Sequence, residues 1–288
     1  MISPSAIFKR GKFLIKGFIA LNVLLISATY GVLASLVLTI LRKRSLAQHS
    51  TARFYYNLLS FTTGLKIQID RPEILEKLPA ILVSNHQSEL DIYMLGAIFP
   101  PKCVVTAKKQ LKYFPFLGWF MSASGTFFLD RSNRQAAINT LNKALQDLKN
   151  DKGGLFMFPE GTRSNSQEPT LLPFKKGAFH LAVDAGIPII PICVSNTSNL
   201  YSMKNWNFES GTINIKVLDP IPTEGLTKDD VPQLCDKVHA LMKKGVEEVG
   251  MSEVNGSAPC KSATSTESAE PEVSQNETAS EETALLSK

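Results

Sequence analysis

The feature that most constrains this chain is an uncharged apolar stretch near its N-terminus. Residues 18–41 contain no charged side chain, and basic residues flank the stretch on both sides. As an α-helix it is roughly 36 Å long, against a hydrocarbon core of about 30 Å. A cleaved signal peptide is the alternative, but its apolar region is shorter, roughly 7–15 residues, and ends at small residues. We therefore expect residues 1–45 to form a retained membrane anchor with one transmembrane helix. The basic flanks on both sides leave its orientation open.

The far end of the chain differs in composition and charge. Residues 252–288 contain seven Glu and two Lys among many Ser, Thr and Ala residues, which is typical of a disordered tail. Because the whole chain has a net charge of +5, the residues before the tail carry +10. A basic body predicts an anionic partner. The anchor favours lipid or a phosphorylated substrate over nucleic acid.

The four cysteines do not form a CxxC pair, which argues against a zinc site and a disulfide framework and suits a reducing compartment. The chain also lacks a Gly-x-Ser-x-Gly elbow, a Walker loop, a Gly-x-Gly-x-x-Gly fingerprint and a His-Glu-x-x-His pair. These absences exclude the common serine hydrolases, P-loop NTPases, Rossmann dehydrogenases and zincins, since each class needs its own device.

Between anchor and tail, apolar runs of strand length alternate with helical patterns. Strands are predicted at residues 66–69, 80–84, 103–106, 126–129, 155–158, 189–194 and 213–218, and helices at 46–64, 132–150 and 227–249. The helix at 46–64 is either a second membrane-associated helix or a helix packed on the domain. Several of the strand runs are continuously apolar, as in strands covered on both faces. The alternation predicts an α/β domain at 46–251, with an open sheet flanked by helices.

A His/Asp pair follows the apolar run 80–84. His86 and Asp91 are five residues apart, so on one continuous helix they would not share a face. They can meet if His86 lies in the strand-to-helix turn and Asp91 in the first helical turn. Asp91 would then fix the tautomer of a His86 general base. The alternative is a surface histidine beside an ordinary helix-start aspartate.

Two further motifs end predicted strands. The run 158–164 contains Glu160, Gly161 and Arg163, and the run 125–131 ends at Arg131. Ligands collect at the carboxyl ends of strands in open α/β sheets, and Arg suits phosphate. We expect Glu160 to orient Arg163. The alternative is an ordinary loop with a surface ion pair.

Lys108, Lys109 and Lys112 precede an aromatic stretch at residues 113–120. Aromatic residues with basic neighbours suit a membrane interface, and they suit a core helix with a basic edge equally well.

With these motifs in place, the chain resembles the 1-acyl-sn-glycerol-3-phosphate acyltransferase (lysophosphatidic acid acyltransferase) family, in its fungal style. Four blocks match in order: Asn85-His86-x-x-x-x-Asp91, Gly125–Arg131, Phe158–Ser164 and Ile187–Ile192. The runs 106–109 and 172–179 strengthen the resemblance, which covers residues 80–195.

The resemblance implies the open mixed sheet of the glycerolipid acyltransferase fold and a role for each motif. His86 would be the general base and Asp91 its partner. The acceptor would be held by residues of the other motifs: Lys108, Arg131, Glu160, Gly161, Thr162 and Arg163. The block at 187–192 would help form the acyl-CoA side.

The implied reaction is transfer of an acyl group from acyl-CoA to lysophosphatidic acid at the endoplasmic reticulum membrane or on lipid droplets. No cofactor or metal is required, although Mg²⁺ could stimulate the reaction through the charged substrates. Two alternatives stay open: a related acyltransferase with another acceptor, such as glycerol-3-phosphate, and a catalytically silent, membrane-tethered lipid-binding protein. The oligomeric state is not predicted.

Overall fold

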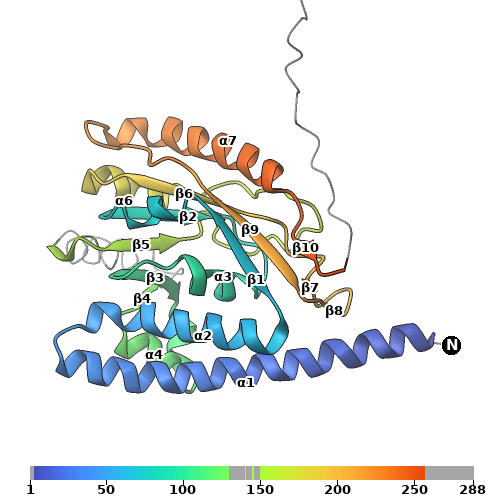
Figure 1. Cartoon of the computed structure of the whole chain (residues 1–288). Coiled ribbons are helices and arrows are strands. Elements are labelled where there is room, and N and C mark those ends of the chain that lie inside the picture. Colours follow the sequence, from blue (N-terminus) through green and yellow to red (C-terminus); the bar gives the residue numbers. More distant parts are fainter. Residues whose placement is uncertain (1–2, 130–139, 141–144, 146–149, 257–288) are drawn as a thin grey trace, which may run out of the picture.

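A computed structural model describes residues 3–129, 140, 145 and 150–256 of this chain (Figure 1). Its centre is an eight-stranded sheet. The strands of this sheet are β1 (Lys66–Asp70), β2 (Ala80–Ser84), β3 (Cys103–Lys108), β4 (Phe127–Leu129), β5 (Gly154–Met157), β6 (Ile189–Val194), β9 (Gly211–Val217) and β10 (Glu253–Val254). A separate hairpin pairs β7 (Tyr201–Ser202) with β8 (Asn207–Phe208).

The sheet is mixed, which confirms the expected fold class. Its order is β1-β9-β6-β2-β5-β3-β4, with β10 on β9. The five strands from β6 to β4 are parallel, whereas β9 runs antiparallel to β6 and parallel to β1. The carboxyl ends of β2, β5 and β3 therefore meet at one edge of the sheet, where the loops after them can converge.

Helices cover both faces of the sheet (Figure 1). They are α1 (Pro4–Ile40), α2 (Ala47–Thr63), α3 (Asp91–Ile98), α4 (Leu117–Ala123), α6 (Gly177–Ala185) and α7 (Val231–Val249). Short 3₁₀ helices lie at η1 (Arg44–Leu46), η2 (Pro72–Glu76), η3 (Lys109–Tyr113) and η4 (Lys228–Asp230). α6 and α7 lie on one face, and α1 to α4 lie on the other side of the molecule.

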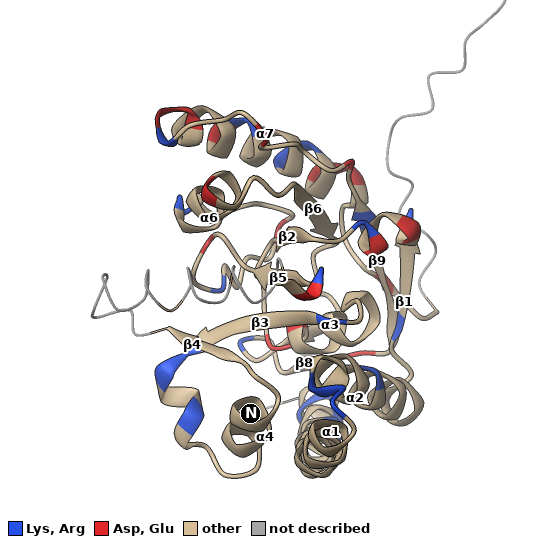
Figure 2. Cartoon of the chain, turned by 90° about the vertical axis from the view of Figure 1, so that its left-hand side faces the viewer, with Lys and Arg blue, Asp and Glu red and all other residues tan. Residues whose placement is uncertain are grey.

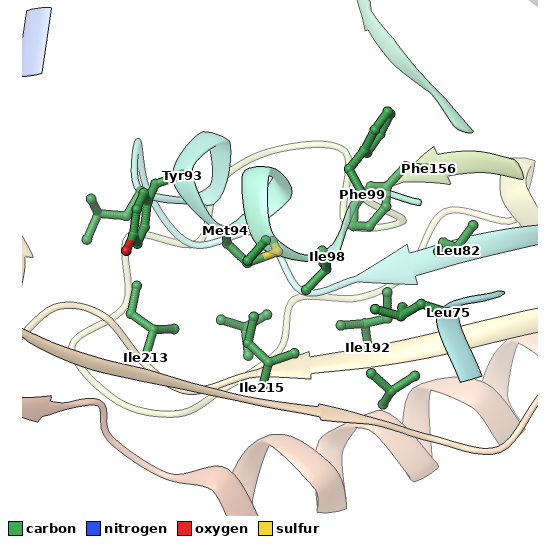
Figure 3. Packing of buried hydrophobic residues seen from close by; sticks show 14 of the residues in the cluster. Leu75, Leu82, Tyr93, Met94, Ile98, Phe99, Phe156, Ile192, Ile213 and Ile215 are labelled. Carbon is green, nitrogen blue, oxygen red and sulfur yellow. The ribbon is translucent and has the colours of Figure 1, made fainter. Parts of the chain in front are cut away.

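Helix α3 is held against the sheet by its apolar side chains (Figure 3). Tyr93, Met94 and Ile98 are fully buried; Tyr93 and Met94 face Ile213 and Ile215 of β9, and Ile98 lies over Ile192 of β6. Every second residue of β9 is buried, as expected for a strand with one face in the core. Burying one such large side chain stabilises the fold by about 1.5–3 kcal/mol. This packing fixes the start of α3, where Asp91 lies.

Helix α1 begins before the apolar stretch and is the candidate membrane span of the described residues. Ser3 caps its first turn and Pro4 stands at its first position, so the helix starts well before residue 18. One face packs on α2 and α4: a Cβ at Gly31 would meet Phe120 and Thr51. The opposite face exposes a row of large apolar side chains: Leu14, Ile15, Phe18, Leu21, Leu25, Leu33, Leu36 and Val37. This apolar face indicates membrane association.

One expected boundary falls differently in the structure, and two expected segments lie largely outside the described residues. The helix expected at 132–150 lies almost entirely outside the described residues. The domain continues past residue 251, because Glu253 and Val254 pair with Thr212 and Gly211 of β9. Residues 257–288 of the expected tail lie outside the described residues.

Candidate active site

His86 and Asp91 meet in the turn between β2 and α3. Asp91 is the first residue of α3, and His86 precedes it in the loop. The His86 Nδ1 atom lies 2.6 Å from Asp91 Oδ2, which also accepts hydrogen bonds from the backbone N–H groups of Gln87 (2.7 Å) and Ser88 (3.2 Å). Asp91 is 3% exposed. A buried carboxylate with these donors holds the proton on Nδ1 and leaves Nε2 as the basic atom.

The amides on either side of His86 lock this loop to the end of β6. Asn85 exchanges two hydrogen bonds with the backbone of Val194, and both are 2.9 Å long. Gln87 donates to the carbonyls of Val194 and Ser195 and accepts from the N–H of Thr197. In each of these side chains, both the amide nitrogen and the amide oxygen therefore bond backbone groups. These contacts set the position of His86 from both sides.

Glu160 supports the same loop from the 158–165 segment. Its Oε1 accepts from the backbone N–H of His86 at 2.7 Å, and its Oε2 accepts from that of Leu172 at 3.1 Å. Glu160 is 3% exposed, and burial raises its pKa against the lowering effect of these two donors. The expectation that Glu160 orients Arg163 is wrong. Both carboxylate oxygens are directed to backbone amides because the loop folds back on the His86 turn.

Arg163 pairs with a different carboxylate. Its guanidinium donates to Glu89 Oε1 at 2.7 Å, and both side chains are partly exposed. An exposed pair of this kind is weak and exchangeable. Arg163 can therefore turn from Glu89 to a phosphate without a large energetic cost.

A cavity of about 560 Å³ opens beside His86. Its apolar wall comes from α2, α3, β3 and α4 and includes Leu95, Phe99, Val105, Leu117 and Phe120. The ring of His86 forms part of the wall and stacks on Phe158, with 4.1 Å between ring centroids. A mostly apolar cavity with a few convergent polar groups suits a ligand with a long apolar portion.

Four of the predicted acceptor residues that the structure describes line this cavity, and Glu160, the fifth, does not. Lys108, Gly161, Thr162 and Arg163 line it together with His86. Gly161 has a φ of +68°, a conformation that favours glycine, and it lets the chain turn close to the cavity. The predicted site residue Arg131 lies outside the described residues.

Lys175 is a cation that the sequence reasoning missed. Its side chain lies across Gly161: the Nζ atom is 2.8 Å from the position that a Gly161 Cβ would take. The backbone N–H of Lys175 bonds the carbonyl of Pro159, which holds the segment against the turn. The Lys-Lys pair at 175–176 was the available signal, but only the fold shows which of the two faces Gly161.

The block at 187–192, expected to help form the acyl-CoA side, does not line the cavity beside His86, and its role toward acyl-CoA stays a prediction. Ile189, Ile190 and Ile192 are 0% exposed in β6, at the centre of the sheet, and the cavity beside His86 is lined by other elements. A strand covered on both faces has no side chain left for a ligand, which explains its continuous apolar sequence.

Similarity to known proteins points to one class of enzyme. The family model described as Acyltransferase matches residues 66–195. The 1-acyl-sn-glycerol-3-phosphate acyltransferase of Saccharomyces cerevisiae is 54% identical over 77% of this chain and 74% of its own length. The human 1-acyl-sn-glycerol-3-phosphate acyltransferase beta is 36% identical over 69% of this chain and 72% of its own length.

A solved structure shares the fold. The crystal structure of the 1-acyl-sn-glycerophosphate acyltransferase PlsC from Thermotoga maritima superposes with a TM-score of 0.68 at 25% identity. The match covers 84% of this chain and 97% of that one. The similarity thus extends beyond the residues of the matched family model.

Proposed function

This chain belongs to the 1-acyl-sn-glycerol-3-phosphate acyltransferase family, and on that premise we propose that it acylates the sn-2 hydroxyl of 1-acyl-sn-glycerol-3-phosphate with acyl-CoA as donor. The product is phosphatidic acid, a precursor of phospholipids and triacylglycerols. The observation that carries the proposal is the His86–Asp91 pair at the wall of a largely apolar cavity that Lys108 and Arg163 also line.

The reaction follows from the geometry of the pair. His86 Nε2 takes the proton of the acceptor hydroxyl while Nδ1–H stays bonded to Asp91. The oxygen attacks the thioester carbonyl carbon, the carbon–sulfur bond breaks, and the imidazolium returns the proton to the leaving thiolate. A thioester is already activated, so the scheme needs no covalent enzyme intermediate and no resident cofactor. General-base catalysis contributes about 10²–10⁴-fold, and positioning supplies the rest.

The other polar groups that line the cavity suit the binding of a phosphate. Lys108 lines the cavity, and Arg163 can leave its exposed partner Glu89 for a stronger, doubly charged anion. Thr162 adds a hydroxyl and Gly161 a close backbone approach. Glu160 serves the acceptor indirectly, through the His86 backbone. Because α1 indicates membrane association, we place the reaction at a membrane, and propose the endoplasmic reticulum.

The test is CoA release from oleoyl-CoA by the purified full chain in detergent. The acceptors are 1-acyl-sn-glycerol-3-phosphate, glycerol-3-phosphate and lysophosphatidylcholine. We expect preference for the first, and a kcat about 10²–10⁴-fold lower for His86→Ala. His180→Ala, on α6 away from the cavity, is the matched control and should keep full activity.

Three outcomes would change the proposal. Preference for another acceptor would make the chain a related acyltransferase. Substantial turnover by His86→Ala would remove the base assignment. No CoA release by folded wild-type protein that still binds lipid would leave a lipid-binding protein.

A further inference from the structure

Four aromatic side chains are exposed within one short segment beside the cavity. Tyr113, Phe114, Phe116 and Trp119 are 74%, 56%, 41% and 56% exposed. We call these four residues the aromatic ledge. Single exposed apolar residues are normal, whereas a group of large aromatic side chains marks an interaction surface.

A strained backbone turn keeps the side chains of the ledge exposed. Phe116 has a φ of +59°, a backbone conformation that is strained for a bulky residue. The turn is fixed by hydrogen bonds from Leu117 N–H to the Pro115 carbonyl (2.6 Å) and from Gly118 N–H to the Phe114 carbonyl (2.8 Å). Phe116 packs beside Trp119, with 5.1 Å between ring centroids. The exposed position of these rings is thus built into the fold.

The inner side of the same segment forms the cavity wall. Leu111, Leu117, Phe120 and Met121 line the cavity that contains His86. The segment of η3 and α4 therefore separates the proposed catalytic base from the exterior on this side. A lipid that passes this segment moves from the ledge directly toward His86.

The ledge is continuous with the apolar helix α1. α4 packs along α1, where Phe120 covers Gly31, and Arg44 donates to the carbonyls of Ser122 and Ala123. Figure 1 shows α1 and α4 on the same side of the molecule, opposite α7. α4 and the apolar helix α1 thus lie side by side, and each exposes large apolar side chains.

Basic residues border the ledge. Lys108 and Lys112 lie just before it, and the Lys residues that precede α4 are blue in Figure 2. Aromatic side chains with flanking cations match the interfacial region of a bilayer, where rings lie at headgroup depth and cations meet anionic headgroups. A protein partner would not require the continuity with α1.

We propose that the aromatic ledge is inserted in the bilayer interface and that the lipid acceptor reaches the cavity past it. The insertion of the ledge in the bilayer is inferred from its exposed rings, its backbone conformation and the neighbouring lysines alone. The entry part rests on the proposed function. The experiment therefore has one arm without turnover and one arm with it.

The first arm measures depth in the membrane. The chain has two tryptophans, so Trp206→Phe leaves Trp119 as the only one. Vesicles of phosphatidylcholine and phosphatidylglycerol carry bromine on their acyl chains, and flotation confirms that the protein is bound. We expect bromine to reduce Trp119 fluorescence about twofold or more. The reference is Leu241→Trp in a chain without Trp119 and Trp206; residue 241 is exposed on α7, on the opposite side, and its fluorescence should not change.

The second arm measures entry of the acceptor. Phe116→Ser combined with Trp119→Ser should raise the KM for acceptor embedded in vesicles about tenfold, equivalent to 1.4 kcal/mol, and leave turnover of detergent-dispersed acceptor unchanged. Leu241→Ser is the control and should behave as wild type in both assays.

Unquenched Trp119 on bound vesicles would overturn the docking. Quenching with an unchanged vesicle KM would overturn the entry route. An equal loss in vesicles and detergent would also overturn it, because the ledge would then support folding. An inactive wild type with quenched Trp119 would refute the proposed function and leave the docking intact.

Discussion

Two buried carboxylates flank His86 and do different work. Asp91 bonds the imidazole and the next two backbone amides, so it sets the ring and its tautomer. Glu160 bonds the backbone N–H of His86 itself, so it sets the position of the whole residue. One carboxylate bonds the side chain and the other bonds the main chain, so together they fix the residue where it lines the cavity.

Glu160→Gln tests the positioning role. The amide can accept one of the two backbone hydrogen bonds, but its NH₂ group then faces the other N–H donor. We expect the free energy of unfolding to fall by about 1–3 kcal/mol and kcat to fall with it. Glu168→Gln, at an exposed position, is the control.

The effect of Glu160→Gln on the free energy of unfolding should also depend on pH. Burial raises the pKa of Glu160 above its ordinary 4.5, so the folded chain binds this proton more tightly than the unfolded chain. The stability that the carboxyl contributes is full below pH 4.5 and declines as pH rises through the folded-state pKa. The stability difference between wild type and Glu160→Gln should therefore shrink with rising pH in thermal unfolding series. A difference that grows with pH would contradict the raised pKa.

Lys175 offers a test of phosphate recognition with a neighbouring control. Its ammonium lies over Gly161, whereas Lys176 lies near α7: burial raises the pKa of the Cys235 thiol there, and the charge of Lys176 partly offsets that rise. Lys175→Met keeps the aliphatic stem and removes the charge. We expect the KM for 1-acyl-sn-glycerol-3-phosphate to rise about tenfold with little change in kcat, and Lys176→Met to have no effect. A KM change for acyl-CoA alone would assign Lys175 to the donor, and unchanged KM values would show that it only packs on the turn.

At this scale, local contacts could be predicted and distant ones could not. The spacing of His86 and Asp91 limits how they can meet, because five residues across a strand-to-helix turn leave one workable arrangement. The partners of Glu160 and Arg163 depend on where the 158–175 segment folds relative to the β2–α3 turn. His86 and Glu160 are 74 residues apart, and no local pattern encodes their contact.

At the scale of elements, the strands whose bounds were predicted from the sequence without error are the fully buried ones. The runs 80–84 and 189–194 coincide with β2 and β6, because both central strands are continuously apolar and fully buried. β7, β8 and β10 were not predicted, since two residues are too few to show a period. The reversed direction of β9 also leaves no mark in its alternation, because parallel and antiparallel strands share the period of two.

Composition predicted the apolar part of helix α1 but not the residue at which the helix begins. The uncharged residues 18–41 indicated an apolar helix, but the first 14 residues of α1 contain four cations, which hid the earlier start. Those cations reach the catalytic domain: Lys12 pairs with Glu209, and Lys16 donates to Ser210. A helix that is apolar on one face and bonded to the domain on the other joins membrane and enzyme in one element.

At the scale of the whole molecule, β10 and the preceding residue Ser252 support the His86 loop from a distance. Ser252 Oγ lies 2.7 Å from Ser195 Oγ, and its N–H donates to the Asn196 carbonyl at 2.9 Å. Ser195 is also bonded by Gln87, next to His86. Gly211 allows this approach, since a Cβ there would lie 2.0 Å from the Glu253 carbonyl oxygen. The path from β10 to His86 therefore runs through two short hydrogen-bonded loops.

Two truncations separate the strand from the rest of the tail. A chain that ends at Gly256 keeps β10 and should match the full chain in unfolding midpoint and kcat. A chain that ends at Gly250 loses β10 and the Ser252 bonds, and we expect its free energy of unfolding to fall by about 2–4 kcal/mol, given roughly 0.5–1.5 kcal/mol for each bond. Its kcat should fall too, because the loop that holds Gln87 loses its outer support. Equal stability and activity of the two truncated chains would mean that β6 alone holds the His86 loop in place.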